Sequence, residues 1–494
     1  MIKVIDIFAG PGGLGEGFSS FSSSRSGRRF ELAMSIEKDP LAHRTLRLRA
    51  FVRQFDGRRL PPAYYEHLRE KLSWEQLAAG SPVEAGNAAS EALCLTLGPD
   101  TVREGRERIS AAIGKTENWV LIGGPPCQAY SLVGRARRSG SKKYVPEADE
   151  RQTLYVEYLQ ILADHAPPVF VMENVKGLLS AQLESRGMFE RIRTDLHDPA
   201  KALRRENRRT GDRRPRYELR ALVMDGSLES DDPRRYIVRA EQFGIPQRRH
   251  RVILLGVRAD MAAARLPMLR PADGHVSVHA ALAGLPRVRS GLSKTPDSNE
   301  SWLRAVAGSV RRGWLGQVDS DVRAKIERVV QSLSAPQAGR GGEVLGEVDA
   351  DLILNHSTRG HIVADLDRYL FSSCYALVRR TSPVLSDFPK ALLPAHANVR
   401  GDASDAVFGD RFRTQLASDP STTVTSHISK DGHYYIHHDP SQCRSLTVRE
   451  AARLQTFPDN YFFCGPRTSQ YHQVGNAVPP GLAVQIAKSV AALF

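Results

Sequence analysis

The sequence lacks any run of 18 apolar residues, and it therefore contains no segment expected to cross a bilayer as a helix. Cysteine is scarce: the five cysteines stand at positions 94, 127, 374, 443 and 464, an odd number without short paired spacings. This pattern argues against both a disulfide framework and a cysteine zinc site. His433, His437 and His438 lie close together, but no acid or cysteine pattern accompanies them, and we predict no metal site.

The first residues do not predict a signal peptide. The opening MIKVIDIFAG is too short, and too soon interrupted by glycines, to be a signal peptide. Together with the unpaired cysteines, this favours a protein of the reducing cytoplasm.

The chain is, in contrast, long and rich in positively charged residues. A chain of 494 residues can bury a sizeable core and is expected to form two or three domains. Lys and Arg number 69 against 55 Asp and Glu, which gives a formal net charge of +14. This balance indicates a polyanionic partner, although a basic surface alone would also suit a membrane surface.

The chain opens with the first unit of a doubly wound α/β domain. Lys3 to Phe8 predicts a strand, Ala9 to Gly17 predicts a glycine-rich turn, and a helix follows. The turn lacks the lysine and hydroxyl residue of a phosphate-binding loop. Leu32 to Ile36 predicts a second strand that ends at Glu37, about 20 residues after the turn, where a carboxylate can accept hydrogen bonds from a ribose. A nucleoside-bearing cofactor is therefore indicated.

The next segment is helical and basic. From His43 to about residue 76 the pattern predicts an inserted helical excursion whose arginines face either solvent or nucleic acid. Residues 79–90 are loop-like, and Ala92 to Leu97 predicts the third strand. Asp100 follows that strand and is a candidate to bind an adenine amino group.

A reactive cysteine is predicted after the next strand. Trp119 to Ile122 is a short apolar run, and GGPPCQAYS follows at 123–131. The glycines allow a tight turn and the prolines fix two φ angles, so the loop would hold Cys127 rigidly. A free thiol has a pKa near 8.5, and the arginines that follow would favour the reactive thiolate. A buried structural cysteine beside an ordinary turn is the alternative.

Two later stretches carry a candidate acid and candidate guanidinium groups. Val169 to Met172 predicts a buried strand ending at Glu173, a candidate acid whose alternative is a helix cap or an ion pair. Gln247, Arg249 and Arg251 alternate before another apolar strand, which would place all three on one face. A surface basic cluster is the alternative for them. Between these stretches, 201–220 carries nine Lys or Arg residues and predicts an exposed or disordered loop with nonspecific phosphate contacts.

The composition changes after about residue 280. Residues 281–443 lose the βα rhythm and predict a second domain, within which 422–426 and 433–437 are expected to be strands. Residues 444–455 then predict a helix in which Thr447 and Glu450 form a capping box. The chain closes with QVGNAVPP at 473–480 and a terminal helix.

Six separated stretches, in this order, resemble the motifs of the cytosine-5 DNA methyltransferases. They are DIFAGPGGLGEGF at 6–18, GGPPCQAYS at 123–131, ENV at 173–175, QRRHRV at 247–252, RSLTVREAARLQTFPD at 444–459 and GNAVPP at 475–480. Residues 281–443 correspond to the variable target-recognition region of that family and show no residue-level match.

The resemblance implies S-adenosylmethionine as the cofactor and double-stranded DNA as the partner, and it assigns roles to residues. The expected cofactor-binding residues are Phe8, Ala9, Gly10, Gly12, Gly13, Glu37, Asp100, Pro125, Asn476 and Val478. The expected catalytic residues are Cys127, Glu173, Arg249 and Arg251. The expected DNA-binding residues are Gln128, Ser131, Arg135, Arg137, Arg138 and Gln247.

The expected architecture is an α/β fold: a doubly wound, Rossmann-like S-adenosylmethionine-dependent methyltransferase domain with a second, smaller target-recognition domain. Residues 1–280 would form the first part of the catalytic domain, with the helical insertion at about 43–90. Residues 281–443 would form the target-recognition domain, and 444–494 would return to the catalytic domain. Such an enzyme is expected on nucleoid DNA of a prokaryotic cell, in a restriction-modification or phage-defence system whose proteins are possible partners.

Three other functions compete with this expectation. Related cytosine-5 enzymes act on tRNA with similar motifs, but the length of the chain between Arg251 and Arg444 favours DNA. A DNA-binding protein that keeps the fold without turnover would not need Cys127, Glu173 and Arg251 together. A cysteine hydrolase would need a histidine partner, and His250, within the motifs, is expected to point away from the two arginines beside it.

Overall fold

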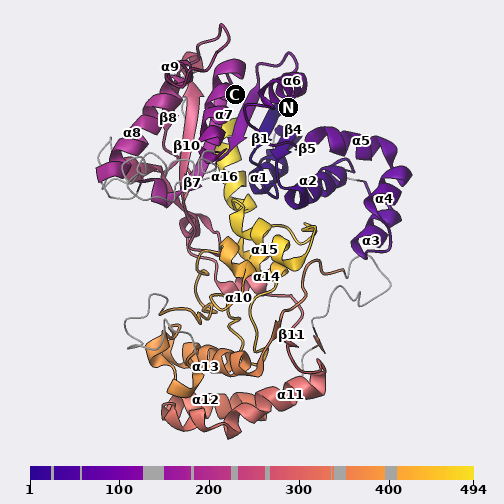
Figure 1. Ribbon diagram of the computed structural model, residues 1–494, viewed down its shortest axis with the longest axis vertical. Helices are drawn as coiled ribbons and strands as arrows, with labels where there is room; N and C mark the ends of the chain where they lie inside the picture. The colour runs from indigo at the N-terminus through magenta and orange to yellow at the C-terminus, as the bar shows by residue number, and fades with distance from the viewer. Residues whose placement is uncertain are drawn as a thin grey trace, which may run out of the picture.

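The computed structural model describes residues 1–23, 27–55, 58–125, 150–179, 183–223, 232–261, 267–334, 337–338, 352–394 and 409–494. Figure 1 shows a sheet flanked by helices at the top and a group of helices at the bottom. Two further helices, α14 (Val448–Leu454) and α15 (Arg467–Asn476), lie between these two lobes.

The upper lobe is built on one mixed sheet. Its strands are β1 (Ile2–Ile7), β4 (Phe30–Glu37), β5 (Ala92–Cys94), β6 (Trp119–Gly123), β7 (Val169–Val175), β8 (Tyr217–Arg220), β9 (Ile237–Arg239) and β10 (His250–Arg258). They run in the order β5-β4-β1-β6-β7-β10-β8, and β9 pairs with β10. The strands from β5 to β7 are parallel, whereas β10 is antiparallel to β7, β8 and β9.

The strand order confirms the predicted doubly wound α/β fold. From β1 the chain moves outward to β4 and β5 and then returns to β6 on the other side of β1. The order therefore reverses between β1 and β6, and sheets of this kind bind ligands at the carboxyl ends of the strands beside such a reversal.

The first and last helices cover one face of the sheet. Both α1 (Gly13–Ser20) and α16 (Pro480–Ala491) bury apolar side chains in the same core as Val4 and Val120. The two helices approach closely because Gly17 has no side chain: a Cβ there would collide with the Ala483 methyl group. Figure 1 shows α16 beside β1 and β7, with the two chain ends near each other.

Four helices cover the other face. They are α6 (Val102–Ile113), α7 (Glu150–His165), α8 (Leu183–His197) and α9 (Pro199–Arg205). Side chains such as Ile109, Leu162 and Ile192 form a second core with Leu121 and Leu254 of the sheet. The sheet is thus buried on both sides, which explains the nearly continuous apolar runs of its central strands.

The helical excursion after β4 contains four helices, and it includes residues 79–90, for which the sequence predicts a loop. They are α2 (Pro40–Arg53), α3 (Pro62–Leu68), α4 (Trp74–Gly80) and α5 (Pro82–Glu91). The loop prediction is wrong because Pro82 begins α5 at a position that needs no backbone donor, and Ala85 and Ala88 are buried. A short hairpin, β2 (Ser22–Ser23) with β3 (Gly27–Arg28), precedes β4.

The lower lobe has its own apolar core. Its helices are α11 (Asn299–Ala307), α12 (Ser320–Gln331) and α13 (Val363–Arg379), whereas α10 (Val278–Leu282) packs with α14 between the two lobes. Two-residue strands, β11 (Val288–Arg289), β12 (Gly291–Leu292), β13 (Gln337–Ala338) and β14 (Gly360–His361), form two minimal sheets. Trp302, Ile326 and Leu370 from three helices meet in the core.

The two strands predicted at 422–426 and 433–437 are not formed. Ser426–Ser429 is a 3-10 helix, and Thr414, Ser421 and Ile436 make isolated bridges. The prediction is wrong because the side chains here pack against α14 and α15 rather than along a hairpin: Val424, Ile428 and Tyr435 share a core with Leu446 and Val474. Within the described ranges, no helix is long and apolar enough to cross a membrane.

Candidate functional site

A cavity of about 930 Å³ opens at the carboxyl ends of β1, β4, β6 and β7, where the strand order reverses. Its wall combines the glycine-rich turn after β1, the loop after β6, the end of β7, and residues of α15. Thr425 and Ser426, from the chain between the two lobes, also line the cavity. One cavity therefore meets both the sheet and the chain between the lobes.

The glycine-rich turn is shaped by positive φ angles. Phe8, Gly10 and Gly12 have φ of 55°, 57° and 92°, a region that a non-glycine residue such as Phe8 rarely adopts. Gly13 must lack a side chain, because a Cβ would collide with the carbonyl oxygen of Val478. The turn therefore presents its main chain to the cavity at the point where Val478, near the C-terminus, packs against it.

The structure brings most of the predicted cofactor-binding residues into this wall. Phe8, Ala9, Gly10, Gly13, Glu37, Pro125, Asn476 and Val478 all line the cavity. Gly12 instead faces Leu46 and Tyr461, and the Tyr461 hydroxyl donates a hydrogen bond to the Pro11 carbonyl behind the turn. The binding roles themselves stay predictions.

Asp100 lies away from the cavity. It is exposed in the turn before α6, and the cavity is lined by Leu95 and Leu97 of the same segment. The acid that follows the strand is therefore not part of the cavity wall. The segment instead offers two aliphatic side chains, which suit the flat face of a base better than its amino group.

Glu37 stands at the end of β4 with both carboxylate oxygens in use. Oε2 accepts a hydrogen bond from the Gly10 amide at 2.8 Å, and Oε1 accepts one from the Asp39 amide at 2.8 Å. Each oxygen keeps a second lone pair that a hydroxyl donor in the cavity could reach. Glu37 therefore holds the turn in place and still faces the cavity.

Asp6 is a site residue to which the sequence pattern assigns no role, although it lies in the first motif. Its side chain is buried and lines the cavity. Oδ2 accepts a hydrogen bond from the Gly15 amide at 3.2 Å, whereas Oδ1 has no hydrogen-bond partner. Burial raises the pKa of Asp6 to about 8, with the Gly15 bond opposing and Glu37 adding to the rise. A buried acceptor without a partner is suited to a cationic or donor group bound in the cavity.

Glu173 and Arg251 form an ion pair in the cavity wall, with Nε and Oε1 2.7 Å apart. The pair forms because β10 runs antiparallel to β7, which sets Arg251 opposite Val175 and close to Glu173. An acid and a guanidinium thus face the cavity side by side. They could bind a planar ligand that offers both a donor and an acceptor on one edge.

The loop after β6 is fixed between two neighbouring strands. Gly123 has a φ of 135°, and a Cβ there would collide with the Ile7 carbonyl oxygen. A Cβ on Gly124 would collide with the carbonyl oxygen of Glu173. Asn174 Nδ2 donates to the Pro125 carbonyl at 3.0 Å. Pro125 therefore enters the cavity wall at a set position, directly beside the predicted acid.

The predicted nucleophile lies outside the described residues. Cys127 falls within 126–149, as do five residues expected to contact DNA: Gln128, Ser131, Arg135, Arg137 and Arg138. Their roles stay predictions.

Gln247 and Arg249 do not share a strand face with Arg251, because β10 begins only at His250. Gln247 is fully buried: its Nε2 donates to the Leu454 carbonyl at 3.1 Å and its Oε1 accepts from the Val424 amide at 2.8 Å. The expectation that Gln247 contacts DNA is therefore not supported, because its amide is engaged by protein on both sides.

Arg249 also connects protein segments. Its guanidinium donates to the carbonyls of Val424 at 2.8 Å and Gly475 at 3.2 Å, and only 1% of the residue is exposed. Burial and the neighbouring Arg251 lower the pKa of Arg249 to about 9. Although Arg249 reaches the cavity wall, these bonds make it a positioning residue that ties Thr425 and Asn476 to the sheet.

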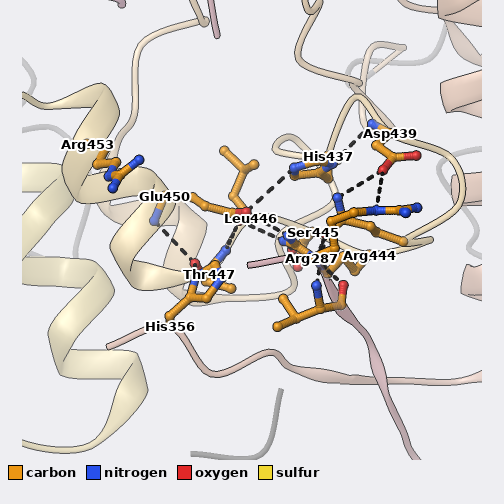
Figure 2. Close-up of polar contacts among 12 residues, drawn as sticks. Arg287, His356, His437, Asp439, Arg444, Ser445, Leu446, Thr447, Glu450 and Arg453 are labelled. Atoms are coloured by element: carbon orange, nitrogen blue, oxygen red, sulfur yellow. Dashed lines mark hydrogen bonds and ion pairs between the residues drawn. The ribbon is translucent and has the colours of Figure 1, made fainter. Parts of the chain in front are cut away.

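A buried ion pair anchors α14 at the junction of the two lobes (Figure 2). Arg444 donates to both carboxylate oxygens of Glu450 at 2.6 Å, and Thr447 and Glu450 form the predicted capping box. Burial would raise the pKa of Glu450, but Arg444 outweighs it and holds that pKa well below its usual range. His437 Nε2 lies 3.5 Å from the same carboxylate. Helix α14 shares an apolar core with α15, which lines the cavity, and Arg444 also donates to the Val288 carbonyl of β11, so the ion pair connects α14 to the lower lobe.

The clustered histidines are engaged by neighbouring side chains. His433 bonds the Tyr369 hydroxyl at 2.8 Å, and His437 stacks on His438 with ring centroids 4.4 Å apart. Among the residues that the structure describes, no group of three or more His, Cys, Asp or Glu residues is arranged to hold a metal ion.

Comparison with known proteins shows what this chain is similar to. A family model for C-5 cytosine-specific DNA methylases matches residues 102–198 and 347–492. The chain is similar to the Type II methyltransferase M.Bpa9945I of Bacillus paralicheniformis, with 29% identity over 99% of this chain and 98% of the relative. It is also similar to the DNA (cytosine-5-)-methyltransferase M.ApeKI of Aeropyrum pernix, with 27% identity over 75% of this chain and 81% of the relative.

One solved structure has a related fold. It is a prophage-encoded protein of E. coli described as a DNA modification methyltransferase, with a TM-score of 0.52 and 18% identity. The alignment covers 99% of this chain and 98% of that one.

Proposed function

Because the chain belongs to the C-5 cytosine-specific DNA methylase family, and is thus a DNA cytosine-5 methyltransferase, we propose that it methylates cytosine in a specific DNA sequence with S-adenosylmethionine as donor. The observation that carries the proposal is that one cavity holds two sets of groups. The glycine-rich turn with Glu37 suits a nucleoside, and the Glu173–Arg251 pair suits the polar edge of a pyrimidine.

The residues at the β1 end of the cavity fit S-adenosylmethionine. Glu37 can accept hydrogen bonds from ribose hydroxyls, and Leu95 and Leu97 can pack against the adenine ring. The free Oδ1 of Asp6 would accept from a positively charged group of the methionine part once the carboxyl group has lost its proton. When bound, this cofactor supplies a methyl group activated by a positively charged sulfur.

The residues at the β7 end would prepare the base. Carbon 5 of cytosine is a poor nucleophile, so the Cys127 thiolate would first bond to carbon 6 and push electron density onto carbon 5. Glu173 would share a proton with ring nitrogen 3, while Arg251 would hold the carbonyl oxygen. After carbon 5 has received the methyl group, its proton leaves to a base, the electrons return, and the bond to the Cys127 sulfur breaks.

The cytosine would have to leave the duplex before these groups could reach it, because carbon 6 is stacked inside double-stranded DNA. Swinging one base out costs a few kcal/mol, which contacts to the DNA backbone must offset. We assign these contacts to Gln128, Ser131 and the arginines at 135, 137 and 138, and assign sequence reading to the lower lobe.

The Type II relatives support a role in restriction-modification or phage defence, acting on nucleoid DNA in the cytoplasm.

A covalent trap tests this function. DNA copied by PCR with 5-fluorocytosine in place of cytosine presents every possible target, and fluorine cannot leave carbon 5 as a cation. We expect a denaturation-resistant protein–DNA adduct that requires S-adenosylmethionine. Cys127→Ser should abolish both the adduct and methyl transfer, whereas Cys94→Ser, at an exposed cysteine outside the cavity wall, should keep both.

Other outcomes would select the competing functions. An adduct with fluorinated tRNA but not with fluorinated DNA would indicate an RNA methyltransferase. DNA binding without any adduct or methylation would indicate a non-catalytic DNA-binding protein. Bisulfite sequencing of DNA from expressing cells would then give the recognition sequence of an active enzyme.

A further inference from the structure

The arginine-rich stretch at 201–216 lies beside the start of β7, at the end of the sheet opposite to the cavity. The Arg216 carbonyl accepts a hydrogen bond from the Ala259 amide at 2.9 Å, next to the residues that pair with the start of β7 at Val169. The cavity lies at the other end of β7, at Glu173 to Val175. Seven residues of strand separate the two ends by about 20 Å. In Figure 1, α9 is at the top and α15 near the middle.

The sequence predicts an exposed or disordered loop for this stretch, and the structure shows it to be a fixed element. Helix α9 begins at Pro199, where Asp198 accepts a hydrogen bond from the Lys201 amide at 3.0 Å. Leu203 is buried in the core of the lobe. Gln160 Nε2 of α7 donates to the Arg209 carbonyl at 3.0 Å, which fastens the loop after α9.

The charges of this stretch are strongly unbalanced. Residues 201–216 contain eight Lys or Arg against Glu206 and Asp212. Three of the arginines pair with carboxylates: Arg205 with Asp195 of α8, Arg208 with Glu157 of α7, and Arg216 with Asp198, which precedes α9, at 3.8 Å.

The other five cations form what we call the arginine surface: Lys201, Arg204, Arg209, Arg213 and Arg214. All five are exposed, and within the part of the chain that the structure describes their charged side-chain groups form no ion pair and no hydrogen bond. Surface charges usually alternate in sign, because like charges repel. Five unpaired cations on a fixed frame therefore form a surface suited to a polyanion.

We propose that the arginine surface binds the phosphate backbone of a second DNA segment, apart from the segment whose cytosine enters the cavity. Guanidinium groups bind phosphate oxygens in a two-pronged geometry, and each such contact releases counterions from DNA. A straight duplex bound at the cavity cannot also reach the arginine surface at the opposite end of the strands. The choice of DNA as the polyanion rests on the proposed function.

Such a surface would hold the enzyme on long DNA. While the cavity side releases one site, the arginine surface would keep another stretch of the same molecule bound, so the local concentration of DNA would stay high. Short duplexes would gain nothing, since they cannot reach both surfaces at once.

A bridging assay tests the proposal without knowledge of the recognition sequence. A duplex is immobilised, the protein is bound to it, and a second, fluorescent duplex is added. We expect the wild type to capture the second duplex. The triple variant Arg209→Gln, Arg213→Gln, Arg214→Gln should capture at least about fivefold less while it still binds the immobilised duplex. The salt slope of total binding should fall by about 0.9 for each phosphate that the variant no longer neutralises.

A matched variant controls for net charge. Arg103→Gln, Arg108→Gln, Arg193→Gln removes three exposed arginines that are each paired with a glutamate three or four residues away in the same helix. It should bridge like the wild type. Equal capture by the arginine-surface variant and the wild type, or no capture by the wild type, would overturn the proposal. Capture of poly-L-glutamate in place of the second duplex would assign the surface to an acidic protein instead.

The readouts separate this proposal from the proposed function. Loss of bridging with an intact covalent adduct on fluorinated DNA concerns the arginine surface alone. If the wild type forms no adduct at all, the proposed function of the cavity fails. The bridging result then still tests the arginine surface independently.

Discussion

Two basic stretches of this chain, α2 and the arginine surface, use the same residue type in opposite ways. In α2, Arg49 and Arg53 turn inward to the buried carboxylate of Glu16, with Arg49 Nη2 2.5 Å from Oε1. Arg53 also pairs with Glu91 of α5. At the arginine surface, five cations face solvent without a carboxylate partner in the described structure.

The difference lies in partners that are distant in the sequence. Glu16 follows the glycine-rich turn, and Glu91 ends the helical excursion. Burial would raise the pKa of Glu16, but Arg49 and Arg53 together outweigh it and lower that pKa below its usual value. A basic run is therefore structural where the fold supplies buried acids, and is available for binding where it does not.

Removing the shared acid should show the largest effect. We expect Glu16→Ala to lower the free energy of unfolding by about 3–5 kcal/mol, because it leaves two largely buried guanidinium groups without their common partner. Arg204→Gln is the matched change at the arginine surface and should shift stability by less than about 0.5 kcal/mol. Urea denaturation of both variants measures the contrast, and similar losses in the two would remove the distinction between the regions.

A substitution of Asp6 tests an acid near the glycine-rich turn that, unlike Glu16, has no ion-pair partner among the described residues. Asp6 is neutral in the folded protein up to a pKa of about 8, whereas in the unfolded chain it ionises near 4. The stability that it contributes is complete below pH 4 and is lost as the pH rises towards 8. Relative to Asp6→Asn, the wild type should lose about 1.4 kcal/mol per pH unit in this window.

The measurement is the unfolding free energy of both proteins between pH 5 and pH 7, with Glu31→Gln, at an exposed residue of the neighbouring strand β4, as the control. A constant difference between the wild type and Asp6→Asn would mean that Asp6 is already ionised when folded. In that case its free oxygen would need a partner that the structure does not show.

The regular part of the fold could be predicted because its signals are local. Buried strands such as β6 and β7 appear as short apolar runs, and the glycine-rich turn needs residues that tolerate positive φ. The pairing of Thr447 with Glu450 likewise follows from a four-residue pattern. These elements were identified because each carries its own physical requirement within a few residues.

The contacts that complete the site could not be predicted in this way. The alternating pattern places Arg249 and Gln247 on the face of Arg251, but segments about 175 residues later capture their side chains. The raised pKa of Asp6 comes from burial in the folded protein, not from its neighbours in sequence. Thr425 and Ser426 reach the cavity because the backbone of Gly475 packs directly against theirs, and no local pattern marks them.

The smallest expected effect concerns the stability of the arginine surface itself. The variant Arg209→Gln, Arg213→Gln, Arg214→Gln relieves repulsion among exposed like charges, so at low salt it should be slightly more stable than the wild type, by less than about 0.5 kcal/mol per substitution. In 1 M salt the screening length falls to about 3 Å and the difference should vanish. For Arg49→Gln, the loss should persist at both salt concentrations, because the Glu16 carboxylate is buried and salt screens buried pairs far less. Thermal unfolding at low and high salt distinguishes the two cases: a salt-independent destabilisation of the triple variant would mean that these arginines hold the fold together, and that their charge is not free for DNA.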